Sequence, residues 1–209
     1  MILPVRLFGD PVLKKPASLI TSFDDNLKQL AQDMLETMYE HNGVGLAGPQ
    51  VGVAKRIFVA LETRKDEAKD DDRPPPQTIE EKRERWGVVG EHVIINPILS
   101  SFEGQAYDVE GCLSIPALYF EEVERSYSLH IRYQDANGET HERLAKGHFA
   151  RVIQHETDHL DGILFLDRLT AEDKRQFMNE NRQALAEMQR EAKAFLKNIK
   201  EQIQPVKVA

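Results

Sequence analysis

The segment QHETDH at residues 154–159 constrains the chain most, because it places two histidines and a carboxylate close together. Residues four apart lie one above the other on a helix, so His155 and His159 can reach one ion. Glu156 lies on the adjoining helix surface, where its carboxylate can reach a water beside that ion. The alternative is an exposed helix that contains two histidines. Apolar residues on both sides of the segment favour a buried helix. A buried and charged His-Glu-His group needs compensation, which a divalent cation supplies.

The third ligand of such a metal centre is not fixed by the spacing. A catalytic centre of this kind uses three protein ligands and keeps one position open. In one protease pattern a third histidine follows six residues after the second, but this chain has Phe165 there. Cys112, in the segment EGCLS at residues 110–114, offers a thiolate, although a free cysteine is more often a small core residue. Glu180 offers a carboxylate from a downstream helix, and the spacing alone does not decide between the two.

The hydrophobic pattern predicts three helices and five short strands. The first helix covers residues 24–41, with a capping box at Ser22 and Asp25 and a stop at Gly43. The second covers residues 148–160 and stops at Gly162. The third is a long helix capped by Thr170 and Asp173. The strands are residues 56–61, 92–99, 105–109, 128–133 and 139–144, the last two joined by an Asn-Gly turn. This order predicts an α+β fold with antiparallel or mixed β-sheets around a central metal-binding helix, an N-terminal helix and a C-terminal helix.

We expect a catalytic domain at residues 1–169 and a C-terminal helical extension of the same domain at residues 170–209. Residues 62–90 are rich in charge and proline and cannot form a core face, so we interpret them as a mobile insertion with a short helix. Trp86 is the one large apolar anchor in this insertion. A binding loop is the alternative interpretation of the same residues.

Composition excludes several classes of function. The formal net charge of −8 leaves no overall basic surface for DNA. No apolar run approaches the roughly 20 residues that cross a bilayer, and the first residues lack a signal-peptide pattern. A single cysteine cannot form an internal disulfide. We therefore expect a protein of the reducing cytoplasm, with no membrane and no DNA among its partners.

Three segments, in this order along the chain, resemble the signature motifs of the peptide deformylase family. They are GVGLAGPQ at residues 43–50, EGCLS at residues 110–114 and QHETDH at residues 154–159. The resemblance covers about residues 6–168, although the charged insertion is longer than the corresponding loop of many members. It implies a metal-dependent hydrolase that removes the N-formyl group from the N-terminal formylmethionine of newly synthesised proteins and releases formate.

The resemblance also implies roles for individual residues. The implied metal ligands are Cys112, His155 and His159. The usual ion is Fe²⁺, while Zn²⁺, Ni²⁺ or Co²⁺ can occupy the same ligands. Glu156 matches the general acid and base. The matches to the donors that stabilise the oxyanion are Gln50 and the backbone N–H of Leu113, and Gly45 matches a residue whose backbone meets the substrate.

A methionine-sized pocket is expected beside the metal. Val44, Val152 and His148 are candidates for its wall, and each of them is equally compatible with the plain core. Glu110 and Arg125 resemble family positions, and we interpret them as an ion pair that supports the site. A lone surface pair is the alternative.

The last predicted helix carries basic residues at spacings that form one stripe, namely Arg190, Lys193, Lys197 and Lys200. The resemblance implies that this helix can dock on the ribosome near the exit of the nascent chain. Acidic residues offset the stripe, so a solvated amphipathic helix is the alternative. Two rival functions also remain: an endopeptidase that uses Glu180 as third ligand, and a ribosome-associated binding module with a purely structural metal.

Overall fold

A computed structural model describes residues 1–64 and 74–203 of the chain. The helices are α1 (Asp25–Glu40), α2 (Ile79–Arg85), α3 (Gly147–Leu160), α4 (Ala171–Glu180) and α5 (Arg182–Ile203). The strands are β1 (Gly45–Ala47), β2 (Ile57–Thr63), β3 (Val88–Glu103), β4 (Ala106–Cys112), β5 (Ile115–Arg125), β6 (Ser128–Gln134) and β7 (Thr140–Lys146). The predicted α+β class with antiparallel sheets is confirmed. No helix in the described ranges is both long and apolar enough to cross a membrane.

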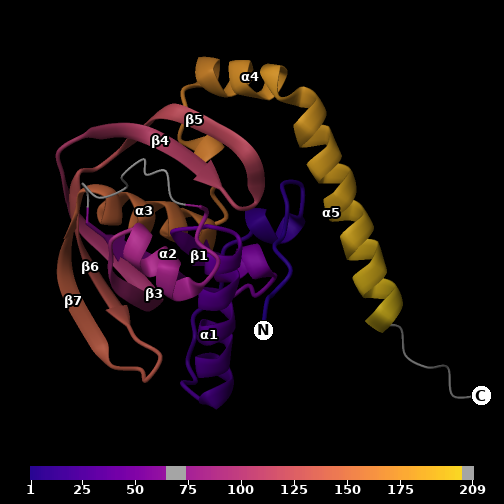
Figure 1. Cartoon of the computed structure of the whole chain (residues 1–209). Coiled ribbons are helices and arrows are strands. Elements are labelled where there is room, and N and C mark those ends of the chain that lie inside the picture. Colours follow the sequence, from indigo (N-terminus) through magenta and orange to yellow (C-terminus); the bar gives the residue numbers. More distant parts are fainter. Residues whose placement is uncertain (65–73, 204–209) are drawn as a thin grey trace, which may run out of the picture.

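A five-stranded antiparallel sheet, in the order β1-β2-β3-β6-β7, lies between helices α1 and α3. Alternate residues of β2 point to opposite faces of this sheet, as the period of a strand requires. Phe58 and Ala60 pack in the same core cluster as Ile153 of α3. Ile57 and Val59 pack in a second cluster with Met34 of α1. Because both faces of β2 are covered, the sheet is buried at its centre (Figure 1).

The second sheet is the β4–β5 hairpin, which covers the side of α3 that faces away from the five-stranded sheet (Figure 1). A third core cluster joins this hairpin to the C-terminal helices and includes Cys112, Val123, Phe165, Phe177 and Leu185. All residues of α3 from position 149 to 160 are buried as a result. The predicted central helix therefore lies between the two sheets, with its histidines inside the molecule.

Strand β5 was not predicted from the sequence. Only three of its eleven residues, Ile115, Val123 and Arg125, are buried, so its sequence lacks the regular alternation of a half-buried strand. Register shifts within its pairing with β4 interrupt the pattern further. Its pairing with the neighbouring strand β4, and the hydrogen bond from Arg151 of α3 to the Val123 carbonyl, make this segment a strand.

The prediction of one long C-terminal helix was wrong, because the chain ends α4 at Glu180 and begins α5 at Arg182. Asn181 caps α4, and its side-chain amide donates to the Phe177 carbonyl over 2.9 Å. Phe177 packs edge-on against Phe165, with ring centroids 6.0 Å apart. This contact holds α4 on the core, and the break lets α5 run in a different direction along the molecule (Figure 1).

The predicted insertion at residues 62–90 is shorter than expected, because β2 extends to Thr63 and β3 begins at Val88. Residues 65–73 of it lie outside the described residues. The predicted short helix is present as α2. The Trp86 ring stacks on Tyr39 of α1, with centroids 5.9 Å apart, and Lys82 donates to the Tyr39 carbonyl. Trp86 is therefore an anchor for the described part of the insertion.

The start and end of α1 differ from the prediction by one or two residues. Asp24, not Ser22, is the N-cap, and its carboxylate accepts the Leu27 N–H over 3.0 Å. At the other end Asn42 takes the left-handed conformation, with φ of 55°, and the N–H of Gly43 then donates to the Met38 carbonyl. Asp24 directly precedes the first helical residue, whereas Ser22 lies two residues before the cap position.

Replacing the true cap is expected to destabilise the protein. Asp24→Ala removes the acceptor of the Leu27 N–H and should lower the free energy of unfolding by about 1 kcal/mol. Ser22→Ala is the matched control, because Ser22 is exposed and precedes the cap. Urea unfolding at a fixed metal concentration measures both variants. A loss for Ser22→Ala as large as that for Asp24→Ala would contradict this assignment of the cap.

Candidate metal centre and active site

Helix α3 presents His155 and His159 on one side, one turn apart. Their ring centroids lie 5.0 Å apart and their planes are inclined by 73°. The helix ends directly after this pair, where Gly162 has a φ of 75° and donates its N–H to the His159 carbonyl. Phe165, which stands where one protease pattern has a third histidine, stacks on His155 at a centroid distance of 6.4 Å. An aromatic ring thus packs against the first imidazole instead of a further ligand.

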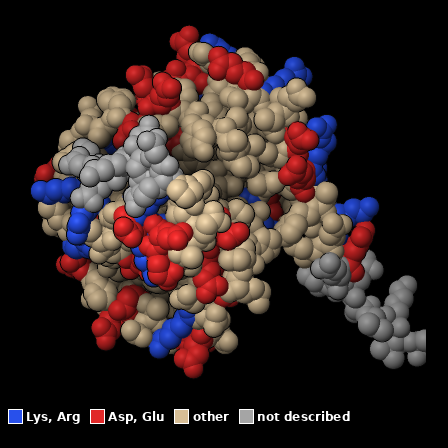
Figure 2. Space-filling model, viewed as in Figure 1, with Lys and Arg blue, Asp and Glu red and all other residues tan. Residues whose placement is uncertain are grey.

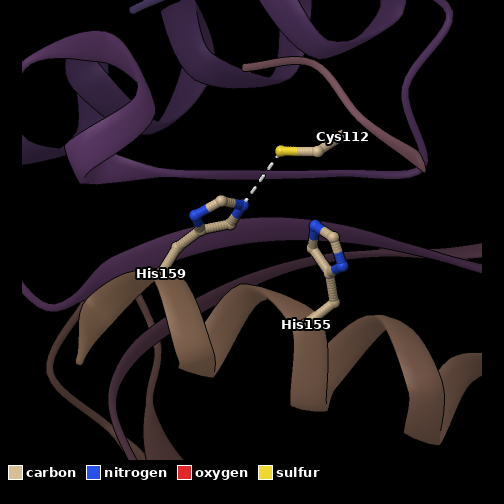
Figure 3. A group of neighbouring side chains, drawn as sticks. All are labelled: Cys112, His155 and His159. Atoms are coloured by element: carbon tan, nitrogen blue, oxygen red, sulfur yellow. Dashed lines mark hydrogen bonds between the residues drawn. The ribbon is translucent and has the colours of Figure 1, made fainter. Parts of the chain in front are cut away.

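Cys112 is the side chain that meets the two imidazoles. Its Sγ lies 3.3 Å from Nε2 of His159, and Figure 3 shows both rings pointing toward the sulfur from below. One ligand atom from each of the three residues lies within 4.8 Å of the other two. The alternative ligand, Glu180, is exposed on α4 and accepts a hydrogen bond from Gln176. The fold therefore brings Cys112 to the histidines and leaves Glu180 on the surface.

Glu110, two residues before Cys112, orients His155. The Glu110 Oε2 lies 2.9 Å from Nδ1 of His155. Hydrogen bonds from His155 and Arg125 outweigh burial and hold the pKa of Glu110 well below its usual value. Because the carboxylate is ionised, Nδ1 is the donor, and the lone pair of Nε2 is left for another partner. A carboxylate bound to the distal nitrogen is the usual support of a metal-ligating histidine.

The predicted ion pair between Glu110 and Arg125 is present, and it belongs to a larger buried network. Arg125 donates to both oxygens of Glu110, over 2.9 and 3.0 Å, and also to Asp158 on α3. Arg151, one turn before His155, donates to Glu110 over 2.8 Å and to backbone carbonyls of both strands of the hairpin. The sequence analysis did not identify Arg151, although its spacing from His155 places it on the same side of the helix.

The donor set fits a divalent cation of the Fe²⁺ or Zn²⁺ kind. Burial lowers the pKa of His159 well below its usual value, which keeps this imidazole neutral, as a ligand must be. Burial also lowers the pKa of His155, but its bonds to Cys112 and Glu110 raise it more, to well above its usual value, so positive charge is favoured at this position. One thiolate and two imidazoles suit a borderline or soft divalent ion.

Glu156 lies beside this group in an enclosed position. Burial raises the pKa of its carboxyl to about 7. Among the described residues its Oε2 is fully buried and has no hydrogen-bond partner. Gly45 lies directly against the same carboxylate, because a Cβ at residue 45 would come within 2.3 Å of Glu156 Oε1. The glycine therefore provides the room that the carboxylate occupies.

Gln50 is held by one end of its amide and presents the other to Cys112. Its Oε1 accepts the Ala47 N–H over 2.7 Å, which ties down the glycine-rich turn. The Nε2 group then points to Cys112 Sγ and Ser114 Oγ, each at 3.4 Å. Gln50 can therefore tie down the turn with its amide oxygen and still offer its NH₂ group to the cavity, since different atoms serve the two roles.

A cavity of about 460 Å³ opens beside these groups. Most of the residues singled out in the sequence line this cavity, namely Val44, Gly45, Gln50, Cys112, Leu113, His148, Val152, His155 and Glu156. His159 does not line it. His148 is mostly buried, and its Nδ1 lacks a hydrogen-bond partner among the described residues. The sequence analysis did not single out several other lining residues, among them Val109, Ile115, Tyr119 and Arg151, because their place at the cavity depends on how the hairpin packs and not on a local motif.

Comparison with known proteins agrees with this geometry. The family model of polypeptide deformylase matches residues 2–175. A peptide deformylase of Thermus thermophilus is 42% identical over 199 residues, which are 95% of this chain and 98% of that protein. A crystal structure of peptide deformylase from the same organism has a TM-score of 0.79 at 42% identity and covers 92% of this chain and 100% of its own.

A second solved structure is the class I type b peptide deformylase of Acinetobacter baumannii bound to Met-Ala-Ser. It has a TM-score of 0.67 at 34% identity and covers 81% of this chain and 99% of its own. The family match spans most of the chain, and the relatives are matched over nearly their whole length. The chain therefore belongs to the peptide deformylase family, whose members are metal-dependent hydrolases that remove the N-formyl group from nascent proteins.

Proposed function

We propose that this chain removes the formyl group with a divalent cation held by Cys112, His155 and His159, and that Fe²⁺ is the physiological ion. The observation that carries the proposal is the approach of one sulfur and two imidazoles to within 4.8 Å beside the enclosed carboxylate of Glu156. The thiolate favours Fe²⁺, Zn²⁺, Ni²⁺ or Co²⁺ over hard cations. It also needs a reducing compartment, in agreement with the cytoplasmic location expected from the sequence.

The cation, when bound, lowers the pKa of a water and polarises the formyl carbonyl. Glu156 takes the proton that this water loses as its oxygen bonds to the formyl carbon. A pKa of about 7 suits a group that accepts a proton and later returns it. When the carbon–nitrogen bond breaks, Glu156 delivers the proton to the departing amine. The products are formate and a peptide with a free N-terminal amine, so all atoms of the amide and the water are accounted for.

The formyl oxygen gains negative charge while the water adds to the carbon. Gln50 Nε2 and the backbone N–H of Leu113 are the proposed donors to this oxygen. Support comes from the amide of Gln50, whose oxygen is bound to Ala47 so that its NH₂ group points to Cys112. A donor fixed in advance needs no reorganisation during the reaction, which is the source of its effect on rate.

The substrate methionine is proposed to enter the cavity that Val44, Val152 and His148 line. Gly45 lies in the short strand β1, and its backbone is proposed to pair with the extended substrate. The peptide Met-Ala-Ser in the Acinetobacter baumannii enzyme is the kind of chain that such a cavity releases. Both features support a substrate that is an N-terminal formylmethionyl peptide.

The C-terminal helix is proposed to contact the ribosome. Its basic residues at 190, 193, 197 and 200 are exposed, and the last three lie on the half of α5 farther from α4. The half nearer α4 is held on the core by Leu185, Met188 and Ala192. An exposed basic stripe on an anchored helix suits binding to RNA phosphates.

Metal analysis tests the ligands. Cys112→Ala is expected to lose stoichiometric metal after anaerobic purification, because it removes one of three ligands. Glu180→Gln is the matched control and should keep its metal, since Glu180 is exposed on α4. Elemental analysis by mass spectrometry measures both. Metal retained by Cys112→Ala and lost by Glu180→Gln would favour the endopeptidase alternative.

Two substitutions test the chemistry on formyl-Met-Ala-Ser. Glu156→Ala should lower kcat by about 10²–10⁴ through the loss of the proton acceptor. Gln50→Leu should lower it by about 10²–10³ through the loss of one donor to the oxyanion. Anaerobic assays of formate release measure both, with metal content and circular dichroism as controls. A folded, metal-loaded Gln50→Leu variant with a much smaller loss would restrict Gln50 to a structural role.

Co-sedimentation tests the ribosome contact. Replacing Lys193, Lys197 and Lys200 with Glu should abolish salt-sensitive binding to purified ribosomes, because the negatively charged stripe then repels the RNA phosphates. Three exposed lysines elsewhere, Lys28, Lys55 and Lys146, give a control with the same change of net charge. Equal loss in the two triple variants would show that total charge, and not the stripe on α5, controls the binding.

A further inference from the structure

The segment from Arg6 to Phe8 does not line the catalytic cavity, but it joins two segments that do. The backbone N–H of Arg6 donates to the Gln50 carbonyl over 2.7 Å. The N–H of Phe8 donates to the Ser114 carbonyl over 2.8 Å. Ser114 is completely buried and donates its own N–H to Cys112 Sγ over 3.4 Å. One short segment therefore holds both the glycine-rich turn and the loop that carries the thiolate.

The side chain of Arg6 is enclosed by three contacts. Its Nε lies 3.1 Å from the Asp10 carboxylate, and the two side chains are only 12% and 2% exposed. Gly52, two residues after Gln50, makes room for the guanidinium, because a Cβ there would come within 3.0 Å of Nε. The third contact is Phe195 of α5, and the guanidinium carbon lies 4.6 Å from its ring centroid. A cation over an aromatic face is attracted more strongly where water is excluded.

Helix α5 contacts the same part of the chain at further points, and Figure 1 shows the indigo N-terminal segment beside this helix. A Cβ at Gly9 would come within 2.8 Å of Gln189 Cγ, so the glycine lets α5 approach the backbone. Leu185 of α5 packs in the same core cluster as Leu13. Charged side chains of both signs cover the outer side of α5, at the right of Figure 2, whereas the Arg6 guanidinium lies against the helix. The position of the N-terminal segment therefore depends on α5.

We propose that Arg6 is a positioning residue, which transmits the docking of α5 to Gln50 and so fixes the donor to the formyl oxygen. The proposal rests on the proposed function and on the role of Gln50 in it. The side-chain oxygen of Gln50 accepts from Ala47 and its backbone carbonyl accepts from Arg6, so the residue is held at both ends. A small shift of this backbone moves the NH₂ group away from the place where the oxyanion forms.

Kinetics in two backgrounds test this proposal, with metal-loaded enzyme and formyl-Met-Ala-Ser. Arg6→Ala should lower kcat about tenfold and leave KM unchanged, because the donor acts on the transition state. The loss should be smaller than the roughly 10²–10³-fold loss for Gln50→Leu, since the donor is displaced and not removed. In the Gln50→Leu background Arg6→Ala should cause no further loss, whereas a general loss of structure lowers the rate in both backgrounds.

Three further variants separate position from stability. Arg6→Lys keeps a cation beside Asp10 and over the Phe195 ring, so it should keep most of kcat. Phe195→Ala removes the ring but leaves the ion pair with Asp10, so it should lower kcat even where Arg6→Ala does not fold. Arg56→Ala is the matched control and should keep kcat, because Arg56 is also partly buried in an ion pair, with Asp161 over 2.6 Å, but does not line the cavity. Circular dichroism and metal content show whether each variant is folded and loaded.

The outcomes distinguish this inference from the proposed function. If the loaded wild-type enzyme releases no formate, the proposed function fails and the inference fails with it. If the wild type is active but neither Arg6→Ala nor Phe195→Ala lowers kcat, the function stands and the positioning role is overturned. The same conclusion follows if Gln50→Leu keeps its kcat, if Arg6→Ala causes equal losses in both backgrounds, or if Arg56→Ala loses as much activity as Arg6→Ala.

Discussion

The carboxylate of Glu110 connects the strand that carries Cys112 to the helix that carries His155. It accepts hydrogen bonds from His155, Arg125 and Arg151, and it is only 5% exposed. A buried carboxylate without partners is very unfavourable, and removing one partner of a buried pair typically costs about 3–5 kcal/mol. The hairpin and α3 must therefore keep their relative position, because any displacement leaves charge buried without compensation. The distance between the thiolate and the imidazoles is a consequence of this constraint.

The fold was predictable where the pattern of apolar residues is regular. Helices α1 and α3 and strand β2 have one or two continuous apolar faces, and their bounds follow from the sequence to within a few residues. Strand β5 has few buried residues and a bulge in its pairing, so its structure depends on Arg151 and on β4. The break between α4 and α5 at Asn181 could not be predicted from the sequence either. The helical pattern continues through it, and the break is stabilised by the Asn181 cap and by the packing of Phe177 on Phe165.

The candidate site divides in the same way. The two histidines and Glu156 follow from helical spacing, which is local information. The choice between Cys112 and Glu180 depends on which strand lies against α3, and here the family resemblance supplied what the spacing could not. The hydrogen bonds of Arg151 to both hairpin strands, and the position of Tyr119 over Gly111, depend on how the hairpin is assembled. No pattern within a single segment indicates them, because a guanidinium bound to two strands and a ring over Gly111 are properties of the assembled fold.

The buried polar atoms without partners show where the chain gives up stability. The described residues contain six side-chain atoms of this kind that lack a hydrogen bond. Arg6 Nε and Asp10 Oδ2 form an ion pair with each other at 3.1 Å, and three of the other four atoms belong to His148, Glu156 and His159. Each typically costs about 1–3 kcal/mol when it stays unsatisfied, so folding alone would favour apolar residues there. Glu156 and His148 line the cavity, and His159 contacts Cys112. Of these atoms, Oε2 of Glu156 belongs to the carboxylate that carries the proton in the proposed reaction, and the burial that costs stability there is also what raises its pKa to about 7.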